Sequence, residues 1–376
     1  MKKNLFKILL SLSLLCSINV AYSNSQDRDV IQLFAQQGDP KSQYNLGWMY
    51  ANGQGLTPNY SKAFEWYNKA AEQGEPKSQF ALGLMYANGQ GITQNYRKAF
   101  EWYSKAAEQG YVDAQNNLGN MYFNGQGITQ NYRKAFEWYS KSAEQGNAAA
   151  QNNLGNMYLD GRGVTQNYRK AFEWYSKSAE QGSADAQNNL GFMYNYIQGG
   201  IQDYSKAFEW YSKAANQGYG EAQFNLALMY ANGQGITQNY SKAFEWYSKA
   251  ANQEHAEAQN SLGSMYFDGQ GITQNYNKAF EWYSKAAEQD YIYAQYNLGL
   301  MYDTGRGVIQ NDKKAVEWYI KAANQGHADA QYFLGHMYED GRGVIQSNKK
   351  AVEWYIKATN QGHEKARIKL AKLEQL

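Results

Sequence analysis

Residues 110–145 read GYVDAQNNLGNMYFNGQGITQNYRKAFEWYSKSAEQ, and nearly the same 36 residues return one after another along most of the chain. A fixed period of this length indicates stacked repeats, each of which contacts its neighbours in the stack. We number the residues of each repeat from position 0 to position 35. Nine repeats end at Gln361, and they begin at Gly38, Gly74, Gly110, Gly146, Gly182, Gly218, Glu254, Asp290 and Gly326.

Each repeat predicts a pair of helices. In residues 110–145, Ala114, Leu118 and Met121 follow the spacing of one helix face. The glycines of the following Asn-Gly-Gln-Gly end this first helix, and Asn131 caps the second. The second helix has an apolar face too broad for the first helix to cover, so another repeat must cover the rest. We therefore predict an all-α fold, a right-handed superhelical α-solenoid of nine 36-residue helix-turn-helix repeats.

The two ends of the chain differ from the repeats. Residues 1–23 have the features of a signal peptide: three lysines, then an apolar run, then small residues near Ser23. The run has about 11 residues, fewer than the roughly 20 that span a bilayer, and we expect no membrane-spanning segment in the mature chain. Residues 24–37 predict an N-terminal capping helix, and residues 362–376 a C-terminal capping half-repeat after the repeats of residues 38–361. We expect an exported protein, either periplasmic or secreted.

Composition argues against several classes of partner and crosslink. The single cysteine, Cys16, lies in the predicted signal peptide, so the mature chain would form no disulfide. The signal peptide also holds three of the 36 basic residues and none of the 34 acidic ones, which leaves 33 basic against 34 acidic residues. A nearly neutral chain without a basic cluster does not fit a nucleic-acid partner. We expect a monomer.

The repeated motif resembles a known family. The pattern A-x-x-x-L-G-x-M-Y-x-x-G-x-G, followed by K-A-x-E-W-Y-x-K-A-A, is similar to the Sel-one-like repeat, a relative of the tetratricopeptide repeat. The resemblance covers Gly38 to Gln361 and implies an α-solenoid that binds proteins or peptides. It also implies a protein of the kind that bacteria often export for envelope assembly, signalling or host interaction.

The chain departs from one branch of that family. A cysteine-rich secreted branch carries paired cysteines in each repeat, and the repeats here carry none. This difference argues against the penicillin-binding or β-lactamase activity attributed to the branch, and we predict that the protein is not an enzyme. Two alternatives stay open: a hydrolase of β-lactams or cell-wall-like amides, and a structural periplasmic scaffold of an envelope complex.

The sequence offers no convincing catalytic, cofactor or metal site. Ser347 and Lys350 match the Ser-x-x-Lys motif of penicillin-recognising enzymes, but the companion motifs are absent, and a polar helix cap explains Ser347. His255, His327 and His363 all stand at position 1 and are separated by multiples of 36 residues, so they lie on different repeats and do not converge on a metal. The methionines at position 11 and the tryptophans at position 28 recur as framework residues.

Residues that vary between repeats are better candidates for binding. If the fold follows tetratricopeptide geometry, the first helices line the concave face and positions 3, 6, 10, 13 and 14 project into it, of which positions 6 and 10 vary most informatively. Amide side chains there could bind the backbone of an extended peptide, and aromatic side chains could form pockets for its side chains. Trp48 is the first candidate anchor. We define the variable column by the thirteen candidate residues Tyr44, Trp48, Phe80, Asn116, Asn120, Asn152, Asn156, Asn188, Phe192, Phe224, Tyr296, Tyr332 and His336.

The alternative is that these asparagines reflect a biased composition and are merely solvated. The glutamine at position 5, from Gln43 to Gln331, is the same in every repeat, and we expect it to form hydrogen bonds between repeats. In the fifth repeat Ile197 replaces the first loop glycine, which predicts a local change of twist. In the last two repeats Asp312 and Asn348 replace a tyrosine, which predicts different packing near the C-terminal end.

Overall fold

A computed structural model describes residues 25–196 and 202–373, and these residues form 20 α-helices and no strand. The predicted signal peptide and Ile197 lie outside the described residues. Helix α2 (Ser25–Gln36) precedes the repeats and α21 (Glu364–Leu373) follows them. Among the described residues, no helix is both long enough and apolar enough to span a membrane.

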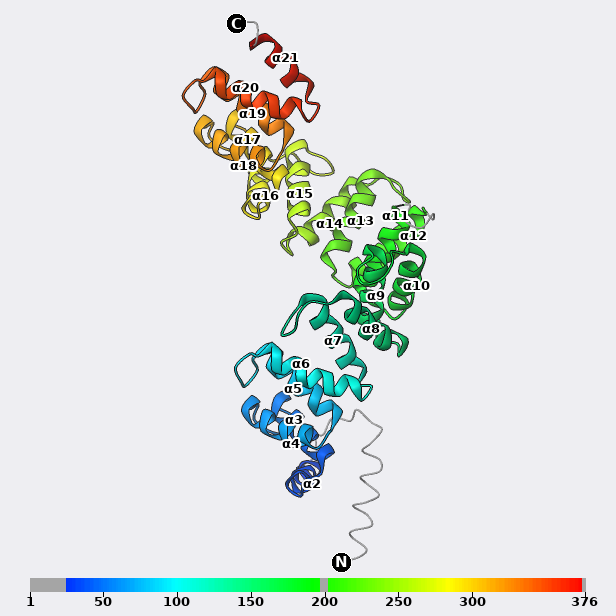
Figure 1. The fold of residues 1–376 in the computed structure, drawn as a ribbon. Coiled ribbons are helices and arrows are strands. Elements are labelled where there is room, and N and C mark those ends of the chain that lie inside the picture. Colours follow the sequence, from blue (N-terminus) through cyan, green and yellow to red (C-terminus); the bar gives the residue numbers. More distant parts are fainter. Residues whose placement is uncertain (1–24, 197–201, 374–376) are drawn as a thin grey trace, which may run out of the picture. The chain divides into compact units, whose positions relative to one another are not determined.

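Every repeat forms two helices, as the periodicity predicted (Figure 1). The first helices are α3 (Pro40–Asn52), α5 (Pro76–Asn88), α7 (Val112–Asn124), α9 (Ala148–Asp160), α11 (Ala184–Asn195), α13 (Gly220–Asn232), α15 (Ala256–Asp268), α17 (Ile292–Thr304) and α19 (Ala328–Asp340). The second helices are α4 (Tyr60–Glu72), α6 (Tyr96–Glu108), α8 (Tyr132–Glu144), α10 (Tyr168–Glu180), α12 (Tyr204–Asn216), α14 (Tyr240–Ala251), α16 (Tyr276–Glu288), α18 (Asp312–Asn324) and α20 (Asn348–Thr359).

The chain divides into two compact units, residues 1–174 and residues 175–376, with the boundary inside α10. We call them the N-terminal unit and the C-terminal unit. In the N-terminal unit, from α3 to α9, each second helix packs against its own first helix and against the first helix of the next repeat. The same order of contacts runs from α11 to α21 in the C-terminal unit. Each unit is therefore a solenoid of stacked helix pairs.

Helix ends follow the predicted signals. The Asn131 side chain accepts a hydrogen bond from the Lys134 backbone N–H at 3.0 Å and caps α8. Gly125 ends α7 in the left-handed conformation, with φ of 71°, which costs glycine little because it has no Cβ. Helix α11 ends differently, since the extended residue Tyr196 follows it. The loss of glycine from this loop therefore changes how the helix terminates.

The Leu-Gly pair of the first helix brings the two helices of a repeat close together. A Cβ atom on Gly119 would lie 2.6 Å from Cδ1 of Tyr139, which is too close for an unperturbed contact. Leu118 and Tyr139 are almost fully buried beside it. Trp138 packs on the cluster that α6 and α7 form, so the tryptophan at position 28 joins neighbouring repeats. This contact confirms its predicted framework role.

The buried glutamine at position 5 joins its repeat to the preceding one. Gln223 is buried, its Nε2 donates to the Ala215 carbonyl oxygen of the preceding repeat at 3.2 Å, and its Oε1 accepts from Gln253 Nε2 at 2.8 Å. The position-5 glutamines of other repeats form equivalent bonds, for example Gln79 with the Ala71 oxygen at 3.2 Å. Gln295 instead donates to the Asp290 carboxylate at 3.3 Å. The predicted hydrogen bonding between repeats is confirmed.

Candidate functional site

All thirteen members of the variable column lie on first helices, and the two units divide them. Seven, from Tyr44 to Asn156, belong to the N-terminal unit, and six, from Asn188 to His336, belong to the C-terminal unit. None is fully exposed: Asn116 and Asn188 are buried, and the other eleven are half-buried. These side chains are therefore partly covered by neighbouring residues and are not simply solvated.

The asparagines at position 6 bind asparagines of the next repeat. Asn153 Nδ2 donates to Asn116 Oδ1 at 3.2 Å and lies 3.4 Å from Asn120 Oδ1. The same pair recurs as Asn225 with Asn188, at 3.1 Å, so it is present in both units. The donors stand at position 7, which was not among the positions expected to bind. The available signal was that each position-6 asparagine is followed by an asparagine at position 7 of the next repeat.

Aromatic members of the column at position 6 pack against position 1 of the next repeat. Phe224 stacks on His255 with ring centroids 4.8 Å apart, and Tyr296 stacks on His327 at 4.5 Å. Trp48 also has structural neighbours, because it packs on the clusters that α2, α3, α4 and α5 form. Part of each column side chain is thus covered by residues of adjacent repeats. Only the part that stays uncovered could contact a partner.

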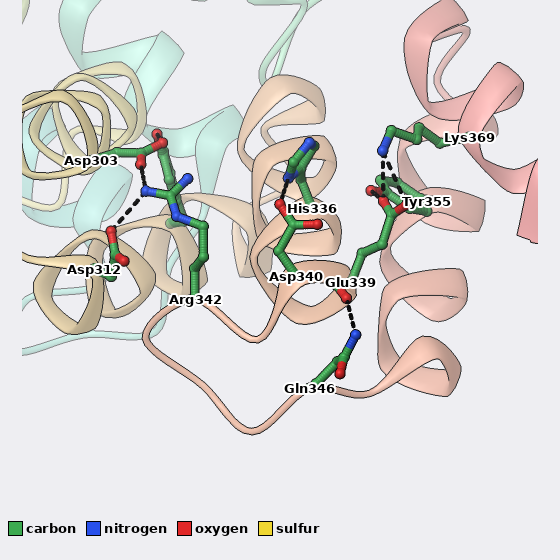
Figure 2. A network of polar contacts seen from close by, with 10 residues as sticks. Asp303, Asp312, His336, Glu339, Asp340, Arg342, Gln346, Tyr355 and Lys369 are labelled. Carbon is green, nitrogen blue, oxygen red and sulfur yellow. Dashed lines mark hydrogen bonds and ion pairs between the residues drawn. The ribbon is translucent and has the colours of Figure 1, made fainter.

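A polar network occupies the C-terminal repeats (Figure 2). Arg342 forms ion pairs with Asp303 and, at 2.7 Å, with Asp312 of the preceding repeat. Asp312, a departure already visible in the sequence, therefore contributes to a junction between repeats. Arg342 was not expected to take part in a contact. A pattern in the sequence could have revealed it: arginine stands at position 16 only where position 13 of the preceding repeat is Phe or Asp, as for Arg162, Arg306 and Arg342.

Glu339 ties the last repeat to the terminal helix. It accepts hydrogen bonds from the Tyr355 hydroxyl at 2.5 Å and from Lys369 Nζ at 2.9 Å (Figure 2). Burial alone would raise the pKa of the Glu339 carboxyl, but these two hydrogen bonds outweigh burial and hold it below its usual range. Beside this contact, His336 Nδ1 lies 2.9 Å from the Asp340 carboxylate. The network joins neighbouring repeats, and the last repeat with α21, through charged residues.

The Ser-x-x-Lys match has a structural explanation. The Ser347 hydroxyl accepts from the Lys350 backbone N–H at 3.3 Å and caps α20, as predicted. The Lys350 ammonium lies 5.0 Å from the Tyr338 ring centroid. Across residues 25–196 and 202–373, no group of three or more His, Cys, Asp or Glu residues is placed to hold a metal ion.

Charge is segregated in the C-terminal unit. Its five first helices, α11, α13, α15, α17 and α19, contain no lysine or arginine but contain eight acids. Its second helices contain twelve lysines and seven acids. Two of the eight acids, Asp303 and Glu339, pair with Arg342 and Lys369. We define the acidic edge by the four exposed acids at position 3, which are Asp185, Glu221, Glu257 and Asp329.

Position 3 differs between the two units. In the N-terminal unit it holds Lys41, Lys77, Asp113 and Ala149, so the charges there balance more nearly. In the acidic edge, the Glu221 and Asp329 side chains are 51% and 54% exposed, which leaves both carboxylates open to solvent. The electrostatic potential of the two first-helix faces must therefore differ.

Comparison with known proteins identifies the repeat. A family model described as Sel1 repeat matches nine consecutive segments, residues 40–75, 76–111, 112–147, 148–183, 184–219, 220–255, 256–291, 292–327 and 328–363. A search of curated proteins gave no match.

Two crystal structures are similar over most of the chain. One is c5321, a protective antigen present in uropathogenic Escherichia coli strains that displays an SLR fold. It is 36% identical, with 92% of this chain and 82% of that chain covered and a TM-score of 0.68. The other, a Sel1 repeat protein from Oxalobacter formigenes, is 35% identical over 82% of this chain and 89% of that one, with a TM-score of 0.61. The nine matched repeats and these structures show that the chain belongs to the Sel1 repeat family.

Proposed function

We propose that this protein is a non-enzymatic scaffold that binds an extended, basic segment of a partner protein along the first-helix face of its C-terminal unit. The observation that carries the proposal is the charge segregation of that unit, where the first helices hold acids and neither lysine nor arginine. Complementary charge accelerates association and selects partners, even where it adds little affinity. A lysine- or arginine-rich segment is the partner that this face favours.

The variable column would supply the uncharged part of the same surface. Phe192, Tyr296 and Tyr332 are half-buried in the C-terminal unit, so part of each ring could contact apolar side chains of the partner. Asparagine side chains both donate and accept, and the half-buried ones retain hydrogen-bonding capacity for a peptide backbone. The seven column members of the N-terminal unit would bind less charged segments.

The test is peptide binding by the mature chain, residues 24–376, followed by fluorescence anisotropy. A lysine-rich peptide should bind, and its affinity should fall as salt screens the charges. The triple variant Asp185→Asn, Glu221→Gln, Glu257→Gln should weaken binding by about tenfold, or roughly 1.4 kcal/mol. Equal binding of a matched acidic peptide would overturn the proposed partner class.

The second helices offer a matched control for this variant. Glu209→Gln, Glu245→Gln and Glu281→Gln remove the same charge from α12, α14 and α16. If the effect depends on net charge alone, both triple variants weaken binding equally, and the proposed face is wrong. Under the proposal, the control changes the affinity less than about twofold, since distant exposed charges are screened.

We also propose that the chain is exported as a monomer, to the periplasm or to the medium, and acts in envelope function or host interaction. The lysines and apolar run of residues 1–23 support export. The similar Escherichia coli protein is a protective antigen, which supports contact with a host. N-terminal sequencing after cell fractionation should find mature chain that begins near Asn24. Turnover of a chromogenic β-lactam would contradict the non-enzymatic part of the proposal.

A further inference from the structure

Three histidines at position 1 cap the helices that follow them. Nδ1 of His255 accepts from the Ala258 backbone N–H at 3.3 Å, and Nδ1 of His327 accepts from the Ala330 N–H at 3.3 Å. His363 accepts in the same way at 3.1 Å. An Nδ1 that accepts must be unprotonated, so the proton of each neutral ring is on Nε2.

Asparagine performs the same task in the fourth repeat. Asn147 Oδ1 accepts from the Ala150 N–H at 2.8 Å, and Asn147 Nδ2 donates to Asp113 at 2.9 Å. Nδ1 of a capping histidine corresponds to this amide oxygen, and Nε2–H corresponds to the amide N–H. The histidines therefore act here as uncharged, amide-like caps, but an imidazole, unlike an amide, can take up a proton.

Only one of the three rings lacks a carboxylate at Nε2. His255 Nε2 lies 2.8 Å from Glu221, and His363 Nε2 lies 3.1 Å from Asp329, both at position 3 of the preceding repeat. For His327 that position is Tyr293, whose ring meets the imidazole edge-on with centroids 5.3 Å apart. Tyr296, on the same helix α17, stacks on the imidazole with ring centroids 4.5 Å apart.

The remaining groups around His327 give its cation little support. Burial raises the pKa of Tyr296 to about 12, so this neighbour is uncharged. On helix α18, the Ala322 carbonyl accepts from the His327 backbone N–H, and the Lys321 ammonium is turned onto the Trp318 ring at 4.1 Å. Asp329, on α19 itself, is the nearby anion, and it is shared with His363 Nε2.

We propose that His327 is an acid-sensitive contact, so that the junction between α17 and α19 loosens on mild acidification while the His255 and His363 junctions stay closed. Protonation at Nδ1 turns the capping acceptor into a donor and leaves the Ala330 N–H without its partner. It also places positive charge at the positive end of the α19 dipole. At the other two junctions a cationic ring would also lose its Nδ1 acceptor, but the carboxylate at Nε2 would pair with the charge, and at His255 the Glu257 carboxylate also lies 3.3 Å from Nδ1.

The pKa shifts agree with this geometry in sign. Burial lowers the pKa of His327, and Asp329 offsets only part of that effect. The stability contributed by neutral His327 is therefore complete above the unfolded-state pKa of about 6.5 and is lost as the pH falls through the lower folded-state value. The hydrogen bond from His255 lowers the pKa of Glu221, which favours the carboxylate form on which the His255 junction depends.

The experiment compares hydrogen exchange of α19 in the wild-type mature chain and in two variants. His327→Asn keeps an Asn147-like cap that cannot be protonated, and Tyr293→Glu supplies the carboxylate found at the other junctions. At about pH 5.5, the first turn of α19 should exchange about threefold faster in wild type than in either variant, and equally at about pH 7.5. Because wild type and variants are compared at the same pH, the intrinsic exchange rate of each amide is the same and cancels from the ratio.

The first turn of α15, behind His255, provides the internal control, and its exchange should match in all three proteins. A wild-type to His327→Asn ratio that is unchanged by pH would overturn the proposal, as would equal acid loosening of α15. NMR titration of the His327 Cε1 proton adds an independent readout. The proposal requires a midpoint below the ordinary value of about 6.5 that rises in Tyr293→Glu, and a midpoint at or above that value would refute it.

Discussion

Buried amides show how single residues hold neighbouring repeats together. Gln223 is only 5% exposed, and it provides partners for both the Ala215 carbonyl oxygen and the Gln253 side chain. An apolar residue of similar size would fill the space but would take away the partner of the Gln253 side chain and leave the Ala215 carbonyl oxygen with backbone N–H donors alone. A buried polar group that loses its partner costs about 1–3 kcal/mol, more than the net gain from an ordinary hydrogen bond.

We predict that Gln223→Leu lowers the free energy of unfolding by about 1–3 kcal/mol, because the hydrogen bonds of Gln223 to Ala215 and to Gln253 are lost. Urea unfolding measures the loss, and hydrogen exchange should place it at α13 and α14. The same substitution at the exposed Gln270 is the control and should change stability by less than about 0.5 kcal/mol. If Gln223→Leu were equally mild, the buried glutamine at position 5 would not stabilise the junction between repeats.

Between elements, the loop before α20 reaches back to the preceding repeat through Arg342. Its guanidinium pairs with Asp303 at the end of α17 and with Asp312 at the start of α18. Asp303 has only 11% of its side chain exposed, so the loss of its cation would leave a poorly solvated carboxylate. Elsewhere, the same loop position contacts aromatic rings, as Arg306 does with Phe267 at 5.5 Å.

We predict that Arg342→Gln destabilises the wild-type chain by about 1–3 kcal/mol more than it destabilises an Asp303→Ala background. Many repeats already combine alanine at position 13 with glutamine in the next loop, for example Ala51 and Gln90. A double-mutant cycle in urea measures this coupling. Arg162→Gln is the control, because Arg162 is half exposed and contacts only rings and a nearby surface acid. Additive effects of the two substitutions would show that the ion pair contributes nothing.

On the scale of the molecule, each helix is stabilised mainly by the helices that precede and follow it in the chain. Within each unit, the helices contact mainly the preceding and the following helix. The described residues contain no cysteine, so no disulfide replaces this packing. The terminal helix α21 covers the cluster of Ala351, Tyr355 and Ala358 at the end of the stack.

We predict that deletion of residues 362–376 loosens α19 and α20 and leaves α3 to α6 unchanged. The deletion exposes the Tyr355 cluster and removes Lys369 from Glu339, and contacts that run between neighbours transmit little further. Hydrogen exchange resolved by peptide should show this gradient. A shorter deletion of residues 374–376 retains α21 and is the control. Loss of protection throughout α3 to α6 would mean that the chain unfolds as one cooperative body.

The sequence by itself determined the repeat, the two helices in each repeat, their caps and the family. These features depend on residues close together in the chain, such as Asn131 and Lys134, or on the period itself. It also predicted that the glutamines bind between repeats, because their identity does not vary with the neighbours. The variable column could be recognised in the same way, by comparing the residues at one position across the nine repeats.

The tertiary structure decided what each column residue touches. Asn116 meets Asn153, 37 residues later, and Arg342 meets Asp303, 39 residues earlier, so neither pair lies within one repeat or one helix period. The exposure of the position-6 side chains could not be predicted from the sequence either, because residues from the next repeat cover them. Helical periodicity fixes which face of a helix a residue occupies, but only the stacking of repeats decides what covers that face.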